Sequence, residues 1–95
     1  MFKLSVLYPS SEGSTFDMNY YREKHLAIVN RVLKPERAEV DKSVDGPFMA
    51  IGHFYFSTQE ALQAGLGGPD VGEAMADVPN YTNVQPQIQI SEIVE

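Results

Sequence analysis

Apolar residues recur at two spacings along this chain: every second residue in four segments, and every third or fourth residue between them. The segment 2–8 alternates between two faces and stops at Pro9, which predicts a β-strand. The segment 48–56 is apolar or aromatic almost throughout, which is typical of a central strand. The segments 37–44 and 87–94 alternate with polar residues, and the charges within 37–44 indicate an edge strand.

The longest helical pattern begins at Asp17, a favourable N-cap residue. Phe16 and Tyr21 occupy the two positions of a hydrophobic staple around this cap. We expect one α-helix from Asp17 to about Leu33, ended by Pro35. The predicted inward face of this helix carries Met18, Tyr21, His25, Ile28, Val29 and Val32.

Two short helices are predicted before the last strand. Ser57-Thr-Gln-Glu60 has the form of a capping box, and the helix that it starts ends at Gly65. Asp70 and Glu73 fit a second capping box, for a helix that ends near Asp77. The order strand, helix, strand, strand, helices, strand predicts an α+β fold of the ferredoxin-like βαββαβ type. At 95 residues, we expect one domain over positions 1–95.

Composition narrows the possible partners. Seven Lys and Arg against thirteen Asp and Glu give a net charge of −6, which argues against a nucleic-acid-binding surface. The absence of cysteine excludes disulfides, thiolate metal sites and cysteine nucleophiles. His25 and His53 lie far apart with no metal-binding spacing, so we expect no bound metal. We find no signal peptide and no membrane-spanning stretch, and therefore expect a cytoplasmic protein without a membrane partner.

His25 is the most informative candidate, because it lies near the middle of the predicted inward helix face. An imidazole there is either held by a structural hydrogen bond or takes part in chemistry. Its neighbours on that face include no carboxylate, so we expect burial to lower the pKa of His25. His25 is thus our candidate catalytic acid–base. Aromatic and imidazole side chains that are candidates for substrate binding are Tyr8, Tyr21, His53, Tyr55 and Tyr81.

Two parts of the sequence resemble a known family. Leu7-Tyr8-Pro9, followed by Phe16-Asp17-x-x-Tyr20-Tyr21-x-x-x-His25, is similar to the opening of EthD-like proteins, named for ethyl tert-butyl ether degradation. The segments Met49-Ala-Ile-Gly-His53-Phe-Tyr55-Phe and Val78-Pro-Asn-Tyr81-Thr-Asn-x-Gln85-Pro86 are similar to the rest of the family.

The resemblance implies a dimeric α+β barrel, in which two four-stranded antiparallel sheets pack face to face with the helices outside. It also implies a small apolar ligand between sheet and helices. Some relatives act as dehydratases or decarboxylases through a histidine, and His25 is the residue that matches best. Others carry the label reductase, but this sequence contains no NAD or flavin motif, and we expect no cofactor.

Three functions remain open from the sequence. The first is an EthD-like enzyme for the catabolism of a small apolar, oxygenated or aromatic compound, by isomerisation, dehydration or cofactor-free oxidation. The second is a metabolite-binding accessory module of an oxygenase system, without chemistry of its own. The third is a haem-binding barrel. In each we expect a homodimer, because the first and third strands carry apolar residues on both faces and helices cover only one.

Overall fold

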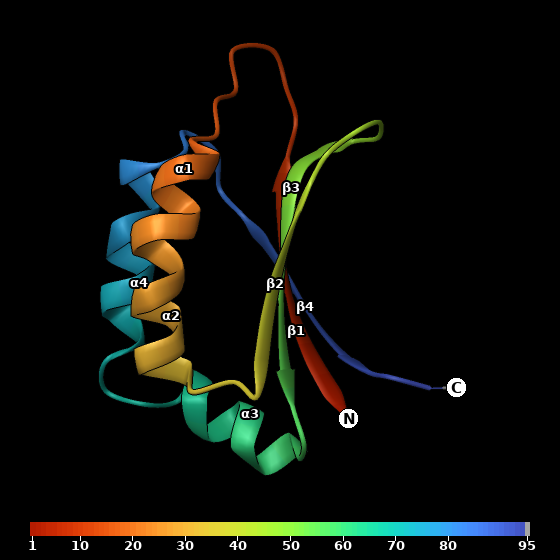
Figure 1. Ribbon diagram of the computed structural model, residues 1–95, viewed down its shortest axis with the longest axis vertical. Helices are drawn as coiled ribbons and strands as arrows, with labels where there is room; N and C mark the ends of the chain where they lie inside the picture. The colour runs from red at the N-terminus through yellow and green to blue at the C-terminus, as the bar shows by residue number, and fades with distance from the viewer. Residues whose placement is uncertain (95) are drawn as a thin grey trace.

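The computed structural model describes residues 1–94 and contains one four-stranded antiparallel sheet with all its helices on one face (Figure 1). The strands are β1 (Phe2–Pro9), β2 (Arg37–Lys42), β3 (Phe48–Phe56) and β4 (Gln87–Glu92). The helices are α1 (Met18–Tyr20), α2 (Leu26–Leu33), α3 (Gln59–Leu66) and α4 (Val71–Asp77), with a π-helical turn η1 (Tyr21–His25) and a 3-10 turn η2 (Val78–Asn80). The strand order β2-β3-β1-β4 confirms the predicted ferredoxin-like fold.

The pairing register decides which side chains lie under the helices. Leu4 of β1 is opposite Phe54 of β3, and both belong to the buried core. The next pair along the strands, Ser5 and His53, therefore points to the opposite face of the sheet. No helix of the described chain covers this face (Figure 1), and we call it the bare face. Leu7 and Ile51 form an apolar pair on that bare face. The bare face is more polar than the sequence pattern predicted, because charged residues of β2 border this pair.

The long helix differs from the prediction in its second turn. Asp17 is the N-cap as expected, since its Oδ1 accepts a hydrogen bond of 3.0 Å from the Tyr20 N–H. The staple also forms, with the Phe16 and Tyr21 rings 5.3 Å apart. The backbone then widens into η1, where the Leu26 N–H donates to the Tyr21 carbonyl. Such π turns within α-helices are frequent at functional sites, and this one contains the candidate catalytic histidine.

Both predicted capping boxes are wrong in detail. The N-cap of α3 is Thr58 rather than Ser57, because the Thr58 hydroxyl accepts from the backbone N–H three residues on. Asp70 precedes α4 but makes no side-chain capping hydrogen bond. Glu73 forms an exposed ion pair with Arg31 of α2 instead of completing a box.

The two outer strands are shorter than predicted. β2 ends at Lys42 and β4 at Glu92, where the sequence pattern extended to residues 44 and 94. These edge strands have only one neighbour each, so their last residues lack the pairing that would hold them in the ladder. None of the helices within residues 1–94 is long and apolar enough to cross a membrane.

Candidate functional site

A cleft of about 420 Å³ lies between the helix layer and strands β1 and β4. Tyr8, Tyr21 and His25 line one end of it, whereas most of the remaining wall is apolar, with Val29 and Leu33 of α2 as examples. Within the described chain, no Lys, Arg, Asp or Glu lines the cleft. The volume and the mostly apolar wall with a few grouped polar side chains are typical of a small-molecule site.

His25 is buried against the aspartate that ends α4. Its Nδ1 lies 2.9 Å from Asp77 Oδ2, and the two residues are only 5% and 7% exposed. The other carboxylate oxygen, Oδ1, accepts hydrogen bonds from the Tyr20 hydroxyl at 2.6 Å and from Asn80 Nδ2 at 2.9 Å. Three donors therefore converge on one carboxylate and fix its orientation relative to the imidazole.

The pKa shifts of the pair favour a neutral histidine beside a charged aspartate. Burial lowers the pKa of His25, and the nearby Asp77 opposes this shift without reversing it. Burial by itself would raise the pKa of Asp77, but the hydrogen bonds from Tyr20, Asn80 and His25 together lower it. A neutral imidazole that donates from Nδ1 to a carboxylate carries its lone pair on Nε2, which can accept a proton.

The Tyr81 hydroxyl lies between the imidazole of His25 and the hydroxyl of Tyr8. It is 3.3 Å from His25 Nε2 and 2.7 Å from the Tyr8 hydroxyl. When Tyr81 donates to Tyr8, the Nε2 lone pair is free and the Tyr8 proton can be donated to a ligand. When Tyr8 donates to Tyr81, the Tyr81 proton is directed at Nε2 instead. Burial raises the pKa of both tyrosines, which therefore remain protonated donors at neutral pH.

Tyr21 brings a further aromatic ring to this end of the cleft. Its side chain is fully buried, and its hydroxyl makes no hydrogen bond within the described chain. The ring reaches the sheet at Gly52 of β3, where a Cβ atom would lie 2.4 Å from the Tyr21 oxygen. Position 52 must therefore be glycine for Tyr21 to sit where it does. A buried hydroxyl without a partner is costly.

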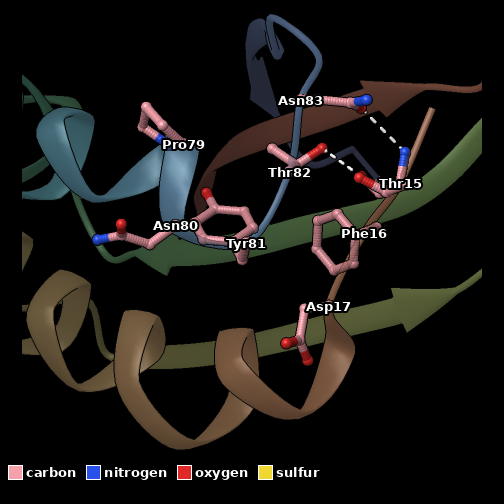
Figure 2. A pocket seen from close by; sticks show the side chains of 8 residues that line it. All are labelled: Thr15, Phe16, Asp17, Pro79, Asn80, Tyr81, Thr82 and Asn83. Atoms are coloured by element: carbon pink, nitrogen blue, oxygen red, sulfur yellow. Dashed lines mark hydrogen bonds between the residues drawn. The ribbon is translucent and has the colours of Figure 1, made fainter. Parts of the chain in front are cut away.

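Two loops hold Tyr81 in place, and Figure 2 shows their junction. The Thr82 hydroxyl donates to the Thr15 carbonyl at 2.7 Å, and the Thr15 N–H donates to Asn83 Oδ1 at 2.9 Å. The Asp17 N–H donates to the carbonyl of Tyr81 itself at 2.8 Å. The residues that start the long helix thus also fix the loop that carries the tyrosine next to His25.

Four of the six candidate residues from the sequence come together here. Tyr8, Tyr21 and His25 line the cleft, and Tyr81 joins Tyr8 to His25 by hydrogen bonds. They come from β1, the π turn and the loop after η2, three segments that are distant in sequence.

The other two candidates, His53 and Tyr55, lie on the bare face of the sheet and do not line the cleft. His53 Nε2 is 2.7 Å from Asp41 Oδ2, and the Tyr55 hydroxyl donates to Glu39 at 2.8 Å. The Arg37 guanidinium stacks 4.3 Å above the Tyr55 ring. These contacts tie β3 to the edge strand β2.

Sequence reasoning missed Asp77 as the partner of His25, because it considered only neighbours on the same helix. A signal was present in the pattern of α4. Asp77 lies three residues after Ala74, so both share the inward face of that helix, and both are buried. An ionisable residue on an apolar helix face needs a partner, and His25 was the candidate available.

Haem iron would have to reach His25 through Nε2, because Nδ1 is bonded to Asp77, and the Tyr81 hydroxyl lies 3.3 Å from that nitrogen. Among residues 1–94 there is no group of three or more His, Cys, Asp or Glu side chains placed to hold a metal ion.

Comparisons with known proteins agree with this fold. No family model and no curated protein matches the sequence. An EthD-like protein from Ralstonia eutropha JMP134 is 32% identical, with a TM-score of 0.86, over 99% of this chain and 92% of that chain. An EthD family protein from Bacillus halodurans C-125 is 19% identical, with a TM-score of 0.72, over 99% of both chains.

A more distant likeness shows how widely the fold is shared. A putative antibiotic biosynthesis monooxygenase from Deinococcus radiodurans is 15% identical, with a TM-score of 0.64, over 99% of this chain and 92% of that chain. At such identity only the fold is comparable. The identity to the Ralstonia protein is higher, at 32% over 99% of this chain, and it establishes the family. The chain belongs to the EthD-like family of the dimeric α+β barrel superfamily.

Proposed function

We propose that this protein is a cofactor-independent proton-transfer enzyme for a small, apolar, oxygen-bearing molecule, with His25 as the general base. The observation that carries the proposal is the His25–Asp77 contact, which leaves Nε2 unprotonated at the polar end of an apolar cleft. A base with a pKa at or below neutral is unprotonated when it meets its substrate.

The proposed step begins with a ligand carbonyl at the tyrosine end of the cleft. His25 Nε2 takes a proton from the carbon next to the carbonyl. The electron pair of that C–H bond forms a C=C bond, and the carbonyl π pair moves onto oxygen. Hydroxyls of Tyr8 and Tyr21 donate to this oxygen as its charge develops. The imidazolium, stabilised by Asp77, then returns the proton to the oxygen, which gives the enol. Where the ligand carries a C=C bond conjugated with the enolate, the proton goes instead to the far carbon of that bond, which completes an isomerisation.

Asp77 is a positioning residue in this scheme, because it acts through His25. It holds the ring in one tautomer and stabilises the positive charge that forms on it. Tyr20 and Asn80 in turn hold Asp77 by its second oxygen. The apolar wall excludes water and so strengthens the electrostatic interactions at the polar end.

We also propose that the bare sheet face pairs two copies into a homodimer. Leu7 and Ile51 lie side by side near its centre, and Met49, two residues before Ile51, lies on the same face of β3. All three are partly buried in the single chain and would be covered by a second sheet. The shared fold of dimeric α+β barrel proteins supports this arrangement.

Deuterium exchange tests proton transfer without knowledge of the natural substrate. The protein is incubated with 2-octanone in D₂O, and mass spectrometry follows deuterium at the carbons next to the carbonyl. We expect catalysed exchange with the native protein and a loss of about 10²–10⁴-fold with His25→Phe. Circular dichroism confirms that the variant is folded.

His53→Phe is the matched comparison, because it removes the other histidine of the chain. Exchange that survives His25→Phe but is lost in His53→Phe would overturn the proposal and move the site to the bare face. Ligand binding without exchange in the native protein would also contradict it, and would favour the accessory module.

A further inference from the structure

The helix wall of the cleft changes from polar to apolar along its length. His25, Val29 and Leu33 follow one another at four-residue intervals, so they share one side of the helix, and all three are buried and line the cleft. The eight residue steps from His25 to Leu33 rise about 12 Å. This wall begins at the imidazole of His25 and ends at the apolar side chain of Leu33.

The sheet wall runs the same way. Tyr8, Val6 and Leu4 alternate along β1 and line the cleft opposite the helix. The four strand steps from Tyr8 to Leu4 span about 13 Å, which matches the helix wall. The Tyr8 ring lies 6.0 Å from that of Tyr21, whereas Leu4 belongs to the same core cluster as Leu33.

The third wall, α4, has the same polarity. Its last residue, Asp77, contacts His25, and its first residue, Val71, packs against the core cluster that contains Leu33. Leu66 at the end of α3 also lines the cleft and packs against this cluster. The cleft is therefore a slot with its polar groups at one end and an apolar far end.

We propose that the slot takes a neutral, elongated ligand: a carbonyl or hydroxyl head at Tyr8, Tyr21 and His25, and an unbranched hydrocarbon tail along α2 toward Leu33. Two observations specify the charge of the head. No basic side chain within the described residues lines the cleft, and the chain carries a net charge of −6, so an anionic head would find no cationic partner. The position of the head rests on the function proposed above, whereas the tail rests on the shape of the slot.

The affinities of a homologous series of 2-alkanones measure the length of the slot. Dissociation constants come from NMR titration of the ¹⁵N-labelled protein with ketones of increasing length. Each methylene that enters the slot should tighten binding about fourfold. The gain should stop once the tail reaches the far end, at roughly eight carbons for a slot of about 12 Å. Binding that does not depend on chain length would overturn the proposal.

Two substitutions at the far end should move that limit in opposite directions. Leu66 and Val71 are only partly buried, so changes there are compatible with folding. Leu66→Ala should extend the series by one or two carbons, and Val71→Phe should shorten it. Val44, fully exposed in the turn before β3, supplies the controls Val44→Ala and Val44→Phe, which should leave the limit unchanged. A limit unmoved by both far-end variants would contradict the placement of the tail.

Octanoate tests the charge of the head. At pH 7 it should bind at least about tenfold more weakly than 2-octanone, because its carboxylate has no cation in the slot. Equal or tighter binding of octanoate would overturn the neutral head. His25→Phe separates this inference from the proposed enzyme: it should abolish exchange yet retain the fourfold gain per methylene. If the native protein shows the chain-length series without exchange, the enzyme proposal fails and the slot proposal stands.

Discussion

At the scale of single residues, the environment of His25 determines its chemistry. The helix places the His25 ring in the buried interior, and this burial lowers the pKa of His25. A second element, α4, supplies the carboxylate that selects which nitrogen keeps the proton. The same two residues also link the ionisation of the site to the stability of the fold.

This linkage predicts that the folded protein loses stability in acid. In the unfolded chain His25 titrates near pH 6.5, and in the folded protein its pKa is lower. The unfolded state therefore binds more protons as the pH falls below about 6.5, and the free energy of unfolding decreases. The lowered pKa of Asp77 adds a further loss in the same direction below about pH 4.

Thermal melts between pH 8 and pH 5 check this sign. The melting temperature of the native protein should fall more steeply with acid than that of His25→Gln, which cannot titrate. Parallel curves for the two proteins would show that His25 has the same pKa in the folded and unfolded states.

Gly52 gives a second prediction at this scale. Gly52→Ala places a Cβ atom 2.4 Å from the Tyr21 hydroxyl and should cost about 1–3 kcal/mol. Tyr21→Phe removes that oxygen and should recover part of the loss. The recovery is incomplete because the Phe54 ring lies 3.2 Å from the same Cβ position. Urea unfolding of both single variants and the double variant measures the coupling, and strictly additive effects would contradict the proposed contact.

At the scale of elements, the start of the long helix serves two purposes. Asp17 caps α1 through its side chain, while its N–H binds the carbonyl of Tyr81. The cap was predictable from sequence because it is local. The π turn that follows was not, because helical periodicity does not reveal one extra residue in a turn. The Asp77 contact was also hidden, since it joins residues 52 positions apart.

The cap supplies a prediction for the element. Asp17→Ala removes the acceptor for the Tyr20 N–H and should reduce the free energy of unfolding by about 1 kcal/mol. Asp17→Asn retains a capping oxygen and should remain close to the native protein. Urea denaturation compares the three proteins, and an alanine variant as stable as the native protein would show that packing alone holds the helix.

At the scale of the whole molecule, the helices cover one face of the sheet and leave the other bare (Figure 1). Alternation along the strands was sufficient to predict the fold, because each strand has a core side and an outer side. It was not sufficient to rank the two faces of β3, and His53 and Tyr55 were accordingly grouped with residues of the opposite face. Only the register with β1 and β2 separates them.

The bare face leads to the prediction for the assembly. Light scattering should give about twice the chain mass of 10.6 kDa at micromolar concentration. Ile51→Asp places a charge in the apolar centre of the proposed interface and should yield a monomer. Val44→Asp, at a fully exposed turn position, should remain dimeric. A native protein that stays monomeric would contradict the homodimer.

The most direct measurement of the central claim is the protonation of His25 itself. The chain has two histidines, so long-range ¹H–¹⁵N correlation spectra at pH 7 contain two imidazole patterns, and His25→Gln identifies one of them. The structure predicts a neutral ring with the proton on Nδ1 and an unprotonated Nε2. A doubly protonated ring, or a neutral ring with its proton on Nε2, would contradict the assignment of His25 as the base.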